Sequence, residues 1–153
     1  MQGIYIDPFK RKSSPIEYEG KPSTFGEFIT EVLECRYFDV ARLYHVDDYD
    51  YVDDHVYIDD EGLYREDQMF WMHRNYPVPL AGCGLLFGGD HEGNTVNVAT
   101  SIDTVKEDVR FIGGLFEVKL MMTLASGNGK NRRDWQEDYR PFVFSDKLKI
   151  IMG

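Results

Sequence analysis

The stretch HVYIDDEGLYR, residues 55–65, combines β-branched and aromatic residues with a turn sequence. Its first half has the composition of a β-strand, and Asp60, Glu61 and Gly62 predict a tight turn that closes the strand. The preceding segment YFDVARLYHV, residues 37–46, predicts a second strand for the same reason. The aromatic-rich connection between the two segments is too short for a helix and favours a hairpin.

Outward towards the N-terminus, one strand, one loop and one helix are expected. GIYIDPF, residues 3–9, predicts a short strand, and the Pro- and Gly-punctuated segment 10–23 predicts a loop. Apolar residues at helical spacing predict an amphipathic helix over 24–35. Thr24 as N-cap and Glu27 three residues later fit a capping box.

Outward towards the C-terminus, the pattern begins with a helical segment and a hairpin. Residues 65–75 predict a helical turn or short helix, which the prolines of YPVP at 76–79 end. AGCGLLFGGD, residues 81–90, predicts a small buried strand, and TVNVATS, residues 95–101, predicts the strand that pairs with it.

Beyond residue 100 the pattern is less regular. Residues 101–116 predict a short helix, whereas 116–124 fit a strand or a helix equally well. Residues 125–141 predict a polar loop, and 142–152 predict one or two closing strands. Because regular strand–helix–strand alternation is missing, we expect a single α+β domain over 1–153, with a mostly antiparallel sheet.

The charge of the chain limits the kinds of partner that we expect the protein to bind. The chain has a formal net charge of -10. Residues 1–80 hold 8 Lys/Arg and 17 Asp/Glu, against 9 and 10 in residues 81–153. An acidic surface repels phosphate backbones and anionic membranes, so we expect no direct nucleic-acid binding and no membrane partner. A partner, if the protein has one, is expected to be basic.

Cys35 and Cys83 are too few for a disulfide framework, and we expect both to be buried free thiols. Together with an N-terminus that lacks a signal-peptide pattern, this indicates a cytoplasmic protein.

The most acidic stretch, residues 44–61, places tyrosines among carboxylates. Two interpretations stay open: a solvated sheet edge, and a recognition surface for a basic protein or a mimic of a DNA backbone. A calcium loop does not fit, because no Gly follows Asp48 and Asp50 and the twelfth position is Asp59 instead of Glu. The candidate partner-binding residues are Tyr44, Asp47, Asp48, Tyr49, Asp50, Tyr51, Asp53, Asp54 and Tyr57.

Two weaker patterns involve chemistry. His73, Asn75 and Cys83 carry the residue types of a thiol hydrolase, but Cys83 falls on an apolar strand and not at a helix N-terminus. The turn at 90–92, Asp-His-Glu, lacks metal-ligand spacing, and no phosphate-binding Gly motif is present. We therefore expect no catalytic residues, no metal and no cofactor.

A second binding hypothesis is a nucleotide pocket. Aromatic rings stack on bases and Arg pairs with phosphate. The residues that would line such a pocket are Trp71, Asn75, Arg132, Arg133 and Trp135.

The pieces TFGEFITEVLE, FDVARL, VYIDDEGLY, NYPVPLAG, CGLLFGGD and IDTVKEDVRFI occur in an order that resembles a small uncharacterised domain family of bacteria and their phages. The resemblance covers about residues 24–113, with the acidic hairpin at 44–61 and the tail 114–153 as elaborations. It implies a phage or mobile-element accessory protein in a bacterial cytoplasm, with Asn75 as the family's polar position.

Together these patterns favour a non-enzymatic protein that binds a basic host protein, with defence inhibition as its purpose. The alternatives are a nucleotide-binding or nucleotide-sequestering protein and a DNA-mimic inhibitor. Exposed hairpin edges make a homodimer plausible.

Overall fold

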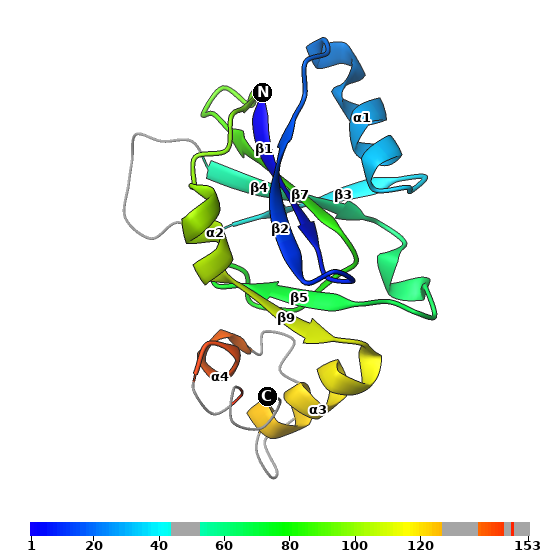
Figure 1. Ribbon diagram of the computed structural model, residues 1–153, viewed down its shortest axis with the longest axis vertical. Helices are drawn as coiled ribbons and strands as arrows, with labels where there is room; N and C mark the ends of the chain where they lie inside the picture. Colours follow the sequence, from blue (N-terminus) through cyan, green and yellow to red (C-terminus); the bar gives the residue numbers. More distant parts are fainter. Residues whose placement is uncertain (44–52, 127–137, 146–147, 149–153) are drawn as a thin grey trace.

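The computed structural model describes residues 1–43, 53–126, 138–145 and 148 (Figure 1). Its larger sheet is antiparallel and follows the order β2-β1-β7-β4-β3, with β8 paired to β7. The strands are β1 (Gln2–Asp7), β2 (Lys12–Glu17), β3 (Phe38–Arg42), β4 (Asp53–Asp59), β7 (Gly84–Gly89) and β8 (Thr95–Val96).

A smaller antiparallel sheet follows the order β6-β5-β9. Its strands are β5 (Phe70–His73), β6 (Leu80–Ala81) and β9 (Val109–Gly113). The helices are α1 (Phe25–Val32), α2 (Ile102–Asp108), α3 (Leu115–Ser126) and α4 (Arg140–Val143), with 3₁₀ turns η1 (Pro22–Thr24) and η2 (Gly62–Tyr64). This is the α+β fold with antiparallel sheets that the sequence predicted.

Alternation along the central strand β7 explains how the layers pack. Leu85 and Phe87 point to one face of the larger sheet, where they meet Phe25 and Ile29 of α1. Leu86 points to the opposite face, into a core shared with the smaller sheet and α2. Both faces of β7 are covered, and all six of its residues are buried.

The second face of the smaller sheet packs on the last two helices. Phe70 and Met72 of β5 contact a cluster that includes Val118 and Met121 of α3 and Val143 of α4. In Figure 1 both helices lie on the side of β5 and β9 away from the larger sheet. The chain thus forms successive layers: α1, the larger sheet, the smaller sheet with α2, and then α3 with α4.

Two predicted elements are wrong on the N-terminal side of β6. Residues 12–17, predicted as loop, form β2 and pair with β1 along its whole length. Pro15 is tolerated because β2 is an edge strand of the sheet. Residues 70–73, predicted as helical, form β5, whose side chains are all buried between two layers. Burial on both faces outweighs helix propensity in so short a segment.

The C-terminal elements also differ from expectation. Residues 115–126, left open between strand and helix, form α3. Residues 140–143 form α4, where closing strands were predicted from residue 142. The aromatic ring of Phe144 holds this end in place, since the guanidinium carbons of Arg74 and Arg110 lie 4.4 and 4.8 Å from its centre.

The predicted capping box of α1 does not form. Thr24 precedes the helix, but its side chain makes no capping hydrogen bond to the helix amides. Its hydroxyl instead donates to the Lys21 carbonyl oxygen at 3.0 Å and contacts the Tyr18 hydroxyl. The preceding 3₁₀ turn takes over the role of the cap.

Candidate functional site

Only the end of the acidic stretch lies among the described residues. Tyr44, Asp47, Asp48, Tyr49, Asp50 and Tyr51 fall outside them. Asp53 and Asp54 begin β4. Asp53 forms an ion pair with Arg42 on the neighbouring strand β3.

Asp54 is completely buried, because it shares a strand face with Val56 of the central core. Its carboxylate accepts hydrogen bonds from the backbone N–H of Ala99 at 2.8 Å and of Thr100 at 3.2 Å, and from the Thr100 hydroxyl. Asp54 is therefore not available to a surface partner, which corrects its sequence-based assignment. It ties β4 to the segment that precedes α2.

Tyr57 is also a core residue, only 7% exposed. Its ring meets Phe25 and Phe38 edge-on, with ring centres 5.6 and 5.7 Å apart. Its assignment to a partner surface is wrong for the same physical reason, since the odd-numbered face of β4 lies under α1.

The nucleotide pocket predicted around Trp71 is not present in the described residues. Trp71 has no exposed surface, and its indole N–H donates to the Gly82 carbonyl oxygen at 2.8 Å. Arg132, Arg133 and Trp135 lie outside the described residues. The ring of Trp71 is therefore core and offers no face to a base.

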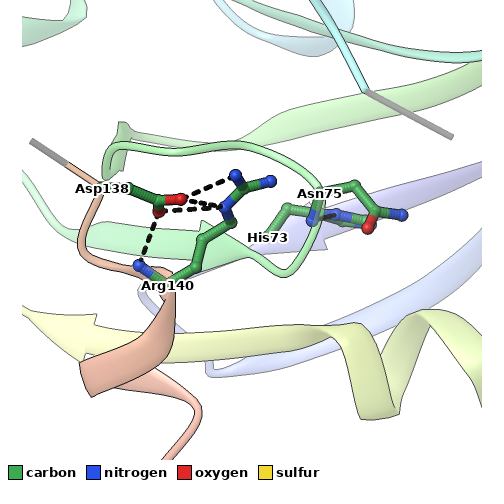
Figure 2. A network of polar contacts seen from close by, with 4 residues as sticks. All are labelled: His73, Asn75, Asp138 and Arg140. Atoms are coloured by element: carbon green, nitrogen blue, oxygen red, sulfur yellow. Dashed lines mark hydrogen bonds and ion pairs between the residues drawn. The ribbon is translucent and has the colours of Figure 1, made fainter. Parts of the chain in front are cut away.

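His73 and Asn75 form a local turn (Figure 2). The Asn75 backbone N–H donates to Nδ1 of the buried His73 at 3.0 Å. Beside them, the Asp138 carboxylate pairs with the Arg140 guanidinium at the start of α4, and this pairing holds the pKa of Asp138 below its ordinary value. Cys83 lies in a pocket that neither His73 nor Asn75 lines, so the thiol-hydrolase pattern is not assembled.

The turn at residues 90–92 is explained by its own hydrogen bonds. The Asp90 carboxylate accepts from the backbone N–H of Glu92 and of Asn94, and these bonds lower the pKa of Asp90. No group of three potential metal ligands occurs within the ranges that the structure describes.

A pocket of about 340 Å³ opens on the α1 side of the larger sheet, at the end away from Asp53. Its floor follows from strand register. Gly84 pairs with Ile6 of β1 and with Ile58 of β4, so the next row across the strands contains Asp7, Cys83 and Asp59. All three line the pocket.

Helix α1 ends at the wall of this pocket, which Val32, Leu33 and Glu34 line. The backbone N–H of Cys35 donates to the Thr30 carbonyl oxygen, and that of Glu34 to the Glu31 carbonyl oxygen, the pattern of a Schellman cap. Glu34 occupies the left-handed position of the cap, with φ of 52°, where glycine is usual. The carboxylate of Glu34 makes no hydrogen bond or ion pair with any described residue.

Arg65 supplies the one cation among the lining residues. Its Nη2 lies 2.9 Å from Asp59 Oδ2 and donates to the Glu34 carbonyl oxygen at 3.0 Å. These contacts bring η2 against the end of α1 and neutralise Asp59. The carboxylates of Asp7 and Glu34 are not paired with a cation within the described residues.

Cys83 lines the pocket together with Tyr5 and Asp7. Burial raises the pKa of Cys83 above its ordinary 9.0, and it raises the pKa of Tyr5 as well. Both groups are therefore protonated and neutral at pH 7. A thiol in this state is a poor nucleophile, so the pocket is suited to binding and not to thiol catalysis.

The charges of the pocket favour a cation. Asp7 and Glu34 carry negative charge without a cationic partner, and the C-terminal end of α1 adds the negative end of a helix dipole. Apolar surface from Phe9, Val32 and Leu33 lies beside these charges. The arrangement fits a group with an aliphatic stem and a positively charged end.

Comparison of the chain with protein families, with characterised proteins and with solved structures gives no match. The resemblance to a bacterial and phage domain family therefore stays a prediction. Among the described residues, no helix is both long and apolar enough to cross a bilayer.

Proposed function

We propose that this protein is a non-enzymatic binding protein for a basic partner protein, and that the pocket between β1, β4 and the end of α1 takes a Lys or Arg side chain of that partner. The observation that carries the proposal is the pair of carboxylates, Asp7 and Glu34, without a cation in a pocket with apolar walls. The net charge of -10 favours encounter with a basic surface.

The size of the pocket supports a single side chain. Its volume of about 340 Å³ is at the low end of the roughly 300–1,000 Å³ that is common for ligand sites. A Lys or Arg side chain would place its methylenes against Val32 and Leu33 and its cation near Glu34. The rings of Tyr5 and Phe9 add an aromatic surface that favours cations.

The same lining residues disfavour a nucleotide as the ligand. A nucleotide would bring its phosphates against Asp7 and Glu34, with Arg65 as the one cation among the lining residues to offset their charge. Like charges at short range oppose such a complex. The setting that the sequence suggests, a phage or mobile-element protein acting on a host protein, stays a prediction.

A peptide titration tests the proposal. The probe is an acetylated and amidated pentapeptide of glycines with one central lysine, and a matched peptide carries glutamate at that position. We expect the lysine peptide to bind and the glutamate peptide not to bind, with affinity that falls as salt rises. Heat of binding at low ionic strength is the measurement.

Glu34→Gln provides the decisive variant, and Glu31→Gln its control. Glu31 is exposed on the same helix and carries the same charge, but it does not line the pocket. We expect Glu34→Gln to weaken lysine-peptide binding about tenfold, the effect of losing ~1.4 kcal/mol. Equal weakening by both variants would assign the effect to general charge and would contradict the pocket.

A further inference from the structure

The pocket contains hydrogen-bond donors that the fold does not use. Both contacts of the Arg65 guanidinium, to Asp59 and to the Glu34 carbonyl oxygen, are made by Nη2. The N–H groups on Nε and Nη1 make no hydrogen bond to the residues that the structure describes. The side chain is 52% exposed, so these donors are accessible from the pocket.

A site with free guanidinium donors beside carboxylates that lack a cationic partner can bind an anionic group and a cationic group at once. Arginine N–H groups bind carboxylates strongly, because the hydrogen bonds are charge-assisted. An isolated anion would be repelled by Asp7 and Glu34. A ligand that carries a carboxylate and a cation close together would satisfy both sets of groups.

The backbone of Glu34 keeps these two sets together. Its carbonyl oxygen accepts the hydrogen bond from Arg65, while its side chain carries one of the unpaired carboxylates. The residue holds a positive φ of 52°, which is unfavourable for any side chain. Glycine would cap α1 with less strain, so the presence of a carboxylate here points to a use for it beyond the fold.

We infer that the pocket takes the carboxy-terminal residue of the partner chain, and that this residue is lysine or arginine. The terminal carboxylate accepts hydrogen bonds from Arg65 Nε and Nη1. The side-chain cation lies at Glu34 and Asp7, and its methylenes lie along Val32 and Leu33. The inference rests on the proposed function and specifies which part of the basic partner enters the pocket.

The test compares peptides that differ in one group. Acetyl-Gly-Gly-Lys with a free carboxylate is titrated against the same peptide with an amidated end, and against acetyl-Gly-Gly-norleucine with a free carboxylate. We expect the free lysine acid to bind at least tenfold more tightly than the amide. The norleucine acid, which lacks the cation, should not bind measurably.

Arg65→Gln is the variant that isolates the carboxylate contact. It should make the lysine acid and its amide bind equally tightly. Arg36→Gln is the matched control, since Arg36 is an exposed arginine that does not line the pocket. Thermal unfolding of both variants checks that the fold is kept.

The outcomes separate this inference from the proposed function. Equal binding of acid and amide to the wild-type protein would overturn the chain-end inference and leave the proposed function standing. Binding of neither lysine peptide would overturn both. Nα-acetyl-lysine carries every group that the inferred contacts use, so it should bind as tightly as the tripeptide, and much weaker binding would contradict these contacts.

Discussion

At the scale of single residues, strand parity decides which acidic side chains are available. Asp53 and Asp54 are neighbours in sequence, yet one pairs with Arg42 at the surface and the other lies without exposure in the core. The alternation of side chains along β4 puts Asp54 on the face of Val56, and this face is covered by the smaller sheet.

This difference predicts a large loss of stability for one of two adjacent substitutions and a small loss for the other. Asp54→Ala removes the acceptor of the Ala99 and Thr100 amides and should lower the free energy of unfolding by roughly 3 kcal/mol. Asp53→Ala should lower it by less than about 1 kcal/mol, because the Arg42 side chain is 70% exposed. Urea unfolding of both variants measures this, and similar losses would contradict the burial of Asp54.

The raised pKa of Cys83 predicts how the reactivity of its thiol depends on pH. Burial raises the pKa of Cys83 above 9.0, so the native state keeps the thiol protonated where a free thiol begins to ionise. In the Cys35→Ser variant, alkylation of Cys83 by iodoacetamide should be slower than alkylation of free cysteine at pH 8 and should rise only at higher pH. Fast reaction near neutral pH would show an activated thiol instead.

The raised pKa of Cys83 also makes the stability of the protein depend on pH. A raised pKa in the native state means that the native state holds the proton more tightly than the unfolded state. The contribution of the Cys83 thiol to the free energy of unfolding is therefore fully present below pH 9.0. It is lost as pH rises through the pKa of the thiol in the native state. Burial raises the pKa of Cys35 as well, in the same direction.

At the scale of elements, the residue that ends α1 lowers the stability of the fold and also serves binding. Glu34 occupies a position where a left-handed conformation costs an ordinary residue about 1–2 kcal/mol. Glu34→Gly should therefore raise the free energy of unfolding by about 1 kcal/mol after the greater flexibility of glycine in the unfolded chain is counted.

The same variant should bind the lysine peptide less tightly, because it lacks the carboxylate. A more stable protein with weaker binding is the expected pair of results, from thermal unfolding and from titration. Leu33→Ala serves as the opposite control, since loss of a buried side chain lowers stability. Loss of stability in Glu34→Gly would contradict the strain at this position.

Elements with a strong periodic pattern were predictable from sequence, and elements defined by tertiary contacts were not. The helix at Phe25–Val32, the strands β3, β4 and β7 and the helix α2 follow their apolar spacing. Strand β2 is polar and contains Pro15, and its identity comes only from its register with β1. Strand β5 is too short for its period to be read.

At the scale of the whole molecule, the candidate site was not predictable because its residues come from distant parts of the sequence. Asp7, Cys83 and Asp59 become neighbours through the register of β1, β7 and β4. Glu34 and Arg65 join them through the end of α1 and the turn after η2. Of these pocket residues, the acidic stretch 44–61 contains only Asp59, and Asp59 was not among the candidate partner-binding residues.

Two locations for recognition of a basic partner therefore compete. The pocket lies at the Asp59 end of β4, and the segment 44–52 joins β3 and β4 at the Asp53 end. With β4 seven residues long, its ends at Asp53 and Asp59 are ~20 Å apart. This separation is large enough for a residue-resolved experiment to distinguish them.

The most direct test is a nuclear magnetic resonance titration of the ¹⁵N-labelled protein with acetyl-Gly-Gly-Lys. We expect the backbone amide shifts to concentrate on Asp7, Glu34, Arg65 and Cys83 and to saturate with one affinity. Shifts concentrated on residues 44–52, or spread evenly over the acidic surface, would contradict it.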